Sequence, residues 1–343
     1  MAGPAAVGAA AARRSHRRTG GTLGVGVRAR GTCRGLGRHG PARSGARAGA
    51  GWKGKGVTAI PALTEFPPRQ EVRRIVTESG TSFAAGMRVL PRRRREAIFA
   101  VYAFCRIVDD IADGMMAPQD KVEALADWSD EVERIFRRVP RTPVGEELAR
   151  AVDRYALPRH EFDLILEGMR MDAEGMVAPD PVRLERYVRC VAGAVGLLSM
   201  RVFGAWRGDA SRRFGLSLAR AMQITNILRD VEEDAGLGRL YLPSTVLQSA
   251  GVPSDPHLAW SHPALPEARR QLGQVARAQF RRAQSAARGH AWVRILPALM
   301  MMGPYDRLLS DMEADWTRPP ERRPGWRKAA DGITCAARSL AGQ

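Results

Sequence analysis

Two short acidic stretches, one in each half of the chain, place the strongest constraint on its fold. The first contains Asp109 and Asp113, and the second contains Asp230 and Asp234, each pair set among apolar residues at helical spacing. Aspartates four residues apart share one face of a helix, where like charges repel each other. We therefore expect two helices that use a bound cation to relieve this repulsion.

The donor atoms of these stretches favour magnesium. Ligands that are oxygen alone, without His or Cys, suit Mg²⁺ better than zinc or copper. Gln223, Asn226, Asp230 and Asp234 follow at spacings of three, four and four, so we expect them on one helix face. The Asn226 carbonyl oxygen is a further potential ligand. Because Mg²⁺ usually also binds substrate phosphate oxygens, a phosphorylated ligand is expected.

A simpler interpretation exists for each stretch taken alone. One pair of aspartates at this spacing is common and indicates only a solvated acidic helix face. The pattern occurs twice, with Arg106 and Arg229 each just before an acidic pair. This repetition favours a cation-binding site. Arg106 lies three residues before Asp109 and could still be no more than its intrahelical ion pair.

The rest of the chain from residue 71 onward predicts helices and no strand. Apolar residues recur at helical spacing between short Pro or Gly breaks. Pro91 opens one helix, and Gly114 and Pro118 close it. We expect further helices near residues 119–138, 144–156, 159–173, 181–205, 209–234, 263–288, 291–316 and 324–340.

Residues 1–60 differ from the remainder in composition. They hold twelve Lys or Arg and no Asp or Glu, so the remaining 42 basic and 36 acidic residues account for only +6 of the net charge of +18. A Gly, Ala and Arg-rich segment buries too little surface to offset its ordering entropy, so we expect disorder. It is a nonfunctional extension, a transit peptide, or a segment that binds nucleic acid or an anionic membrane. The near-neutral body predicts no nucleic-acid partner.

Cysteine usage and hydropathy bear on the compartment. The four cysteines are scattered without a CxxC pair, which indicates a reducing compartment. No run of about eighteen apolar residues is present to span a membrane. We expect a cytoplasmic protein, attached to a membrane only peripherally, and an organellar one only if the N-terminal extension is a transit peptide. Four consecutive arginines, residues 92–95, form either a solvated rim or a contact for an anionic headgroup or diphosphate.

Five motifs, in order, resemble those of the squalene/phytoene synthase family of head-to-head prenyl transferases. They are Thr81-Ser82-Phe83, the first acidic stretch, residues 191–198, the second acidic stretch, and residues 238–243. The resemblance covers residues 71–330 and is closest to the bacterial presqualene diphosphate synthases. It implies an all-α, single-domain isoprenoid synthase helical bundle with a central active-site cavity, over residues 65–343.

The family's activity would be a Mg²⁺-dependent condensation of two farnesyl diphosphates to presqualene diphosphate, with release of diphosphate, in squalene or hopanoid biosynthesis. The partners implied are farnesyl diphosphate and the downstream enzymes of the squalene pathway. NADPH is not expected. Three Mg²⁺ ions would be held by Asp109, Asp113, Asn226, Asp230 and Asp234.

The resemblance also assigns roles to individual side chains. Those implied in catalysis are Tyr102, Arg106, Asp109, Asp113, Asp230, Asp234 and Tyr241. Those implied in substrate binding are Ser82, Phe83, Arg106, Val191, Val195, Gln223, Asn226, Arg229 and Tyr305. The valines would line a hydrophobic channel for the prenyl tails, although small and apolar residues at 191–198 also fit ordinary helix packing.

Other functions stay open. A phytoene synthase would condense two geranylgeranyl diphosphates, and a complete squalene synthase would go on to reduce its intermediate with NADPH. A terpene cyclase or chain-elongating prenyl transferase would carry different acidic motifs. A di-iron protein is disfavoured because no Glu has a His three residues later. A non-catalytic, basic-tailed binding protein leaves both acidic helices unexplained.

Deletion of residues 1–58 tests the interpretation of the N-terminal segment. A disordered segment makes no packed contacts, so the melting temperature and the Mg²⁺-dependent rate should not change. Both are measured on the purified full-length and shortened chains. A large loss of rate on soluble substrate would show that the segment takes part in the reaction.

Overall fold

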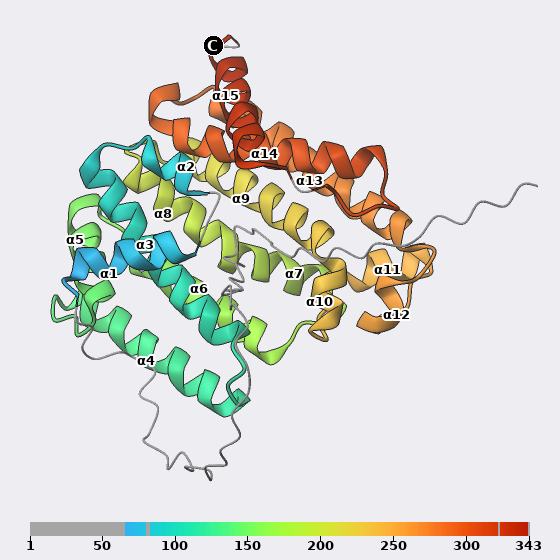
Figure 1. The fold of residues 1–343 in the computed structure, drawn as a ribbon, viewed down its shortest axis with the longest axis horizontal. Helices are drawn as coiled ribbons and strands as arrows, with labels where there is room; N and C mark the ends of the chain where they lie inside the picture. Colours follow the sequence, from blue (N-terminus) through green and yellow to red (C-terminus); the bar gives the residue numbers. More distant parts are fainter. Residues whose placement is uncertain (1–65, 80–82, 322, 342–343) are drawn as a thin grey trace, which may run out of the picture.

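The computed structural model describes residues 66–79, 83–321 and 323–341. Within these ranges the chain forms a single all-α domain without β-strands, which confirms the predicted fold class (Figure 1). The prediction of disorder for residues 1–60 lies outside the described residues. The helices are α1 (Pro68–Glu78), α2 (Phe83–Arg88), α3 (Arg92–Asp113), α4 (Pro118–Phe136), α5 (Pro143–Tyr155), α6 (Arg159–Glu174), α7 (Pro181–Val188), η1 (Arg189–Gly193), α8 (Ala194–Val202), α9 (Asp209–Arg229), α10 (Val231–Gly236), α11 (Ser244–Ala250), α12 (Pro256–Trp260), α13 (Leu265–Ala287), α14 (Trp292–Ala314) and α15 (Gly325–Ala341).

Most helix limits follow the sequence signals. Helix α3 starts after Pro91 and ends before Gly114, as predicted. Helices α4, α5, α6, α13, α14 and α15 lie within two residues of their predicted limits at both ends. The short helices α11 and α12 were not predicted, because so few residues cannot show a helical period.

Two predicted helices are interrupted, and both interruptions occur in the motifs. The expected helix 181–205 contains the π-helical turn η1 between α7 and α8. The expected helix 209–234 divides at Asp230, whose φ of −99° and ψ of 13° leave the helical region. Two backbone hydrogen bonds still cross this point, from Asp230 N to Asn226 O at 2.9 Å and from Asp234 N to Asp230 O at 2.8 Å. The prediction of one uninterrupted helix over residues 209–234 is therefore wrong, because the backbone leaves helical geometry at Asp230.

The helices that carry the acidic pairs lie at the centre of the bundle. Helix α3 packs against α1, α4, α5, α6 and α8, while α9 packs against η1, α8, α13 and α14 (Figure 1). Their apolar faces are fully enclosed, with Val101, Phe104, Phe214 and Leu228 each 0% exposed. Burial of this kind contributes about 1.5–3 kcal/mol per large apolar side chain and fixes the directions of both helices.

Glycines allow close contact around η1. A Cβ on Gly168 of α6 would lie 2.6 Å from Val191 Cγ1, and one on Gly196 of α8 would lie 3.1 Å from the Gly215 carbonyl of α9. A larger residue at position 168 would therefore push α6 and η1 apart. Small residues in residues 191–198 do permit close helix approach, as their composition predicts.

The loop that follows α10 is attached to the loop that follows α6. An isolated parallel bridge joins Val177 and Leu240. Its hydrogen bonds run from Ala178 N to Leu240 O and from Leu240 N to Met176 O, both 2.8 Å. This attachment fixes the positions of Arg239 and Tyr241, which flank Leu240.

Candidate active site

The first acidic pair lies at the C-terminal end of α3. Asp109 is buried, with 6% of its surface exposed. The Arg106 guanidinium binds chiefly to Asp110, at 2.6 Å from Nη2 to Oδ1 and 3.0 Å from Nε to Oδ2. Its nearest approach to Asp109 is 3.9 Å. Arg106 is therefore not simply the ion-pair partner of Asp109.

The second acidic pair lies where α9 meets α10. Arg229 binds the Asp230 carboxylate through two contacts of 2.7 Å, one to each oxygen. Tyr305 of α14 hydrogen-bonds to the side chains of Arg229 and Asn226. Burial alone would lower the pKa of Arg229, but Asp230 and Tyr305 outweigh it and raise the pKa above its usual value. Burial raises the pKa of Tyr305 to about 12, against the effect of Arg229. The guanidinium thus stays charged and the phenol neutral.

Arg239 connects the two acidic stretches. Its Nη1 donates to Asp113 Oδ1 at 2.6 Å, and its backbone N donates to the Asp234 carbonyl at 2.9 Å. Burial would lower the pKa of Arg239, but Tyr241, Asp172 and Asp113 outweigh burial and raise it. The end of α3 and the end of α10 are therefore held beside one another by a charged side chain. Arg239 was not among the predicted site residues, although an Arg inside an otherwise apolar loop was a usable signal.

Asp172 of α6 was also missed. It is 5% exposed and accepts hydrogen bonds from the hydroxyls of Tyr187, at 3.0 Å, and Tyr241. The two tyrosine rings stack with centroids 5.1 Å apart. The hydrogen bond from the Tyr241 hydroxyl to Asp172 fixes the position of the Tyr241 ring, two residues after Arg239.

The oxygen donors fit a hard cation. Asn226 is 5% exposed, and its Oδ1 is a buried acceptor without a hydrogen-bond partner in the structure. An unsatisfied buried acceptor is costly, and a metal ion or a donor would relieve that cost. Within the described ranges, no three His, Cys, Asp or Glu side chains are close enough to form a complete metal centre. A magnesium ion here would draw further ligands from water and substrate oxygens, as Mg²⁺ commonly does.

An apolar cavity of about 50 Å³ lies among α8, α9 and α14. Val195, Met222 and Met301 are among the side chains that line it. Val191 is buried against Gly168 and is not part of this lining. The cavity is much smaller than a prenyl tail, so a bound tail would need these side chains to move.

The other predicted site residues have varied surroundings. Tyr102 is buried on α3, and the Gln223 Oε1 accepts from Asn226 Nδ2 at 3.4 Å. Ser82 lies outside the described residues. Phe83 begins α2, and its side chain is not described. The structure therefore groups Gln223, Asn226, Arg229, Asp230 and Tyr305 in one place.

The four consecutive arginines do not act as a unit. Arg94 donates to the Phe203 carbonyl at the end of α8, which is a structural contact. Arg92 pairs with Glu96 at 3.0 Å. Arg92 and Arg93 also line an open groove of about 740 Å³ between α3 and α5, where Arg154 lies beside acidic side chains. The interpretation as a uniform solvated rim is therefore wrong for Arg94.

Comparison with known proteins identifies relatives. Residues 76–329 match the model of the squalene/phytoene synthase family. Presqualene diphosphate synthase from Rhodopseudomonas palustris is 41% identical over 228 residues, which cover 66% of this chain and 81% of that protein. Phytoene synthase from Rhodobacter capsulatus is 37% identical over 192 residues, 56% of each chain. A solved dehydrosqualene synthase superposes with a TM-score of 0.71 at 22% identity, over 80% of this chain and 97% of that one, and supports the fold.

Replacement of Asp172 tests its part in holding the site together. In Asp172→Ala, two buried tyrosine hydroxyls lose their acceptor, so the free energy of unfolding should fall by roughly 2–5 kcal/mol. The matched control is Asp163→Ala on the same helix, whose exposed carboxylate lies 3.6 Å from Arg159. The control should change stability by less than about 0.5 kcal/mol. Equal losses in urea unfolding of both variants would contradict the role given to Asp172.

Proposed function

We propose, because this chain belongs to the squalene/phytoene synthase family, that it condenses two farnesyl diphosphates to presqualene diphosphate and releases diphosphate. The chain is a prenyltransferase of squalene and hopanoid biosynthesis. The observation that carries the proposal is the junction at Arg239, where a buried arginine draws the two acidic stretches together. The choice of product rests on the similarity to a presqualene diphosphate synthase over two thirds of the chain.

Magnesium is part of the proposal. Asp109, Asp113, Asn226, Asp230 and Asp234 would hold Mg²⁺, with three ions bound alongside the substrate diphosphates. Bound Mg²⁺ supplies neutralisation of the negative charge that develops on the leaving diphosphate. The unpartnered Asn226 Oδ1 and the buried Asp230 carboxylate support this assignment.

The arginines of the site bind and stabilise the diphosphates. Arg106 and Arg229 each pair now with a carboxylate of the chain and would exchange part of that pairing for phosphate oxygens. A guanidinium that stays charged when buried is suited to this exchange, because its donors match oxyanion geometry. Such groups favour ionisation by stabilising charge where it develops.

The proposed reaction proceeds in two bond-forming steps. The C–O bond of one farnesyl diphosphate breaks, which gives diphosphate and an allylic cation. The double bond of the second substrate attacks this cation, and loss of a proton closes the cyclopropane. The released diphosphate accepts the proton. The second substrate keeps its own diphosphate, so the product is a C30 diphosphate.

Aromatic and apolar side chains surround the carbon centres in this proposal. The ring of Tyr241, fixed through Asp172, and the buried Tyr102 would shield the cation by cation–π contact, and Tyr305 lies near the reacting carbons. Val191 and Val195 would line the path of the prenyl tails. Each buried CH₂ unit contributes about 0.8 kcal/mol, so the tails supply much of the binding energy.

Cofactors and partners follow from the product. Condensation to presqualene diphosphate involves no reduction, so NADPH is not required. Another enzyme of the squalene pathway would continue from there. Among the described residues, no helix is both long and apolar enough for a membrane crossing. We propose peripheral attachment to a membrane, since the product is a C30 lipid.

The main alternative is phytoene synthesis from two geranylgeranyl diphosphates. The similarity to the Rhodobacter capsulatus phytoene synthase supports it, at lower identity and over a shorter span. Both reactions would use the same acidic stretches, so the substrate and product decide between them.

A product assay tests the proposed function. Purified protein is incubated with Mg²⁺ and farnesyl or geranylgeranyl diphosphate, with and without NADPH, and the products are identified by mass. We expect a C30 diphosphate from farnesyl diphosphate under both conditions. Squalene formed with NADPH would make the chain a complete squalene synthase, and faster C40 formation would make it a phytoene synthase.

Substitution of the proposed metal ligands tests the site separately. Asp109→Asn should lower turnover at least about a hundredfold, because it removes a charged oxygen ligand. Mg²⁺ and diphosphate together should raise the melting temperature of the wild type, and this rise should be absent in the variant. Asp120→Asn, an exposed change at the start of α4, is the control and should leave both unchanged.

Asp230→Asn should show the same loss of turnover with an added loss of stability. The sequence alone predicts that this change leaves folding intact. The structure shows Asp230 paired to the buried Arg229, so loss of the carboxylate should cost about 3–5 kcal/mol of stability. Near-normal activity in both aspartate variants would contradict the site.

A further inference from the structure

Helix α15 has an apolar stripe on its outer side. Trp326 and Ile333 are 69% and 61% exposed, and Ala330 and Ala337 are exposed as well. These positions follow at spacings of four, three and four, so they lie within an arc of about 60°. A surface helix normally turns polar residues to the outside and apolar ones to the core. On α15, by contrast, large apolar residues lie on the outer face.

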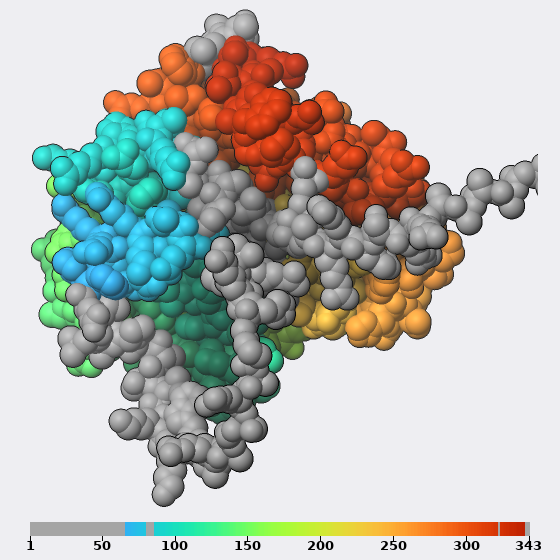
Figure 2. Space-filling view, viewed as in Figure 1, coloured from blue at the N-terminus to red at the C-terminus, as the bar shows by residue number. Residues whose placement is uncertain are grey.

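The inner side of α15 is closely packed on α14. A Cβ on Gly332 would lie 2.7 Å from the Met300 carbonyl, and one on Gly303 would lie 2.3 Å from the Asp331 carbonyl. Small residues let the two helices touch along their backbones. Figure 2 shows α15, in red, at the molecular surface. Because the small residues of α15 face α14, its large apolar residues face outward.

Cations border this apolar stripe. The Cζ atom of Arg327 lies 5.2 Å from the centroid of the Trp326 ring. Arg338, near the C-terminal end of α15, is exposed. Neither arginine has an acidic partner among the described residues. At about 100° per residue, both project to the same side of the stripe. The face thus combines an apolar strip with positive charge along one edge.

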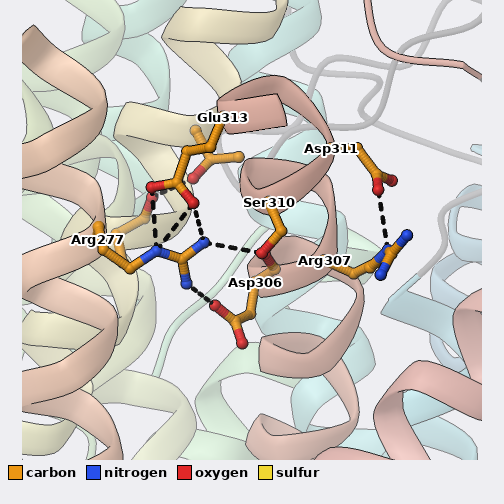
Figure 3. A network of polar contacts seen from close by, with 8 residues as sticks. Arg277, Asp306, Arg307, Ser310, Asp311 and Glu313 are labelled. Carbon is orange, nitrogen blue, oxygen red and sulfur yellow. Dashed lines mark hydrogen bonds and ion pairs between the residues drawn. The ribbon is translucent and has the colours of Figure 1, made fainter. Parts of the chain in front are cut away.

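A pocket of about 480 Å³ opens beside that edge, among α13, α14 and α15. Its lining includes Arg288, Arg307, Thr334 and Arg338, together with two carboxylates. The Arg307 side chain is engaged by Asp311 at 2.9 Å (Figure 3). Arg288 and Arg338 have no acidic partner within the described ranges, so both side chains can bind an anion from another molecule.

Both carboxylates of the pocket are already compensated. Asp306 accepts from Arg277, which also binds Glu313 and Ser310 (Figure 3). Asp331 pairs with Arg323 at 2.7 Å. The pocket therefore presents an excess of positive charge next to an exposed apolar stripe.

We infer that this face of α15 docks the protein on an anionic phospholipid membrane. The stripe of Trp326, Ala330, Ile333 and Ala337 enters the acyl boundary, and the pocket between Arg288 and Arg338 receives a lipid phosphate. An apolar strip edged by arginines is the pattern of helices that lie in the membrane interface. This inference rests on the peripheral attachment proposed above and not on which product the enzyme forms.

The position of the face suits a lipid product. The Met300 backbone of α14 contacts α15, while the next residue, Met301, lines the apolar cavity. The packed helix pair α14 and α15 thus separates the cavity from the proposed membrane face. A product released from the cavity would pass this helix pair to reach the bilayer.

A fluorescent probe on α15 tests the contact directly. Ile333→Cys is labelled with an environment-sensitive dye in the full chain, with Cys33 and Cys335 replaced by Ser. Vesicles of equal parts phosphatidylcholine and phosphatidylglycerol should shift its emission to the blue. The same dye at Val122→Cys, 52% exposed on the distant α4, should not shift. The dye reports on α15 itself, whatever the cationic residues 1–60 contribute to binding.

Flotation of the full chain with the same vesicles tests whether Ile333 and Arg338 contribute to membrane binding. Ile333→Glu and Arg338→Glu should each weaken partitioning at least about tenfold, since each removes one component of interfacial binding. Val122→Glu and Arg154→Glu make the same changes of charge on α4 and on the α3–α5 groove, and should bind like the wild type. Turnover of detergent-dispersed substrate should be unchanged in all four.

Several outcomes would overturn the inference. They are an absent dye shift at position 333, an equal shift at position 122, and wild-type partitioning of Ile333→Glu. Loss of binding in Arg154→Glu alone would place the membrane contact at the α3–α5 groove. A lipid-free dimer that Ile333→Glu dissociates would make the face a contact between two copies of the chain. None of these depends on the product assay.

Discussion

Compensation of buried aspartates by arginine is the interaction on which the site depends. A buried carboxylate without a partner costs several kcal/mol, so helices that carry such groups into a bundle core need cations there. Arg229 meets this need for the buried Asp230 on the adjacent residue, and Arg239, just beyond α10, pairs with the half-buried Asp113. The same guanidinium groups suit diphosphate. The pairs that stabilise the fold therefore place the proposed phosphate-binding groups beside the proposed magnesium ligands.

Departures from regular helix geometry occur at Asp230 itself and in η1, which packs on α6 and α9. The π-helical turn η1 adds a residue to the turn that contacts Gly168, and the backbone leaves helical geometry at Asp230, where α9 ends. Such irregularities carry an energetic cost and persist where surrounding contacts determine them. Here the surrounding contacts are a glycine that admits Val191 and a bidentate ion pair. Both irregularities thus occur where a helix is held by specific contacts with its neighbours.

The sequence predicted the parts of this structure that are local. Helices such as α3 and α6 repeat an apolar pattern over many residues, and their limits carry Pro or Gly, so their positions could be read directly. The interruption at Asp230 was missed because the spacing of four residues and the backbone hydrogen bonds across it are those of a continuous helix. Arg239 and Asp172 were missed because their partners Asp113 and Tyr241 lie 126 and 69 residues away. The arginine in an apolar loop could have drawn attention to Arg239, but one sequence contains no signal for which distant residue is its partner.

Helix α15 shows a further limit of periodicity. Its apolar residues recur at helical spacing, and that pattern alone predicts that they face the core. The structure places Gly332 and Ala336 inward and Trp326 and Ile333 outward, because the contact with the α14 backbone admits only small side chains. A period identifies a face, but the size of the residues on each face decides which one the protein can bury. The larger apolar face then needs another environment, and the cations along its edge favour one that is both apolar and anionic.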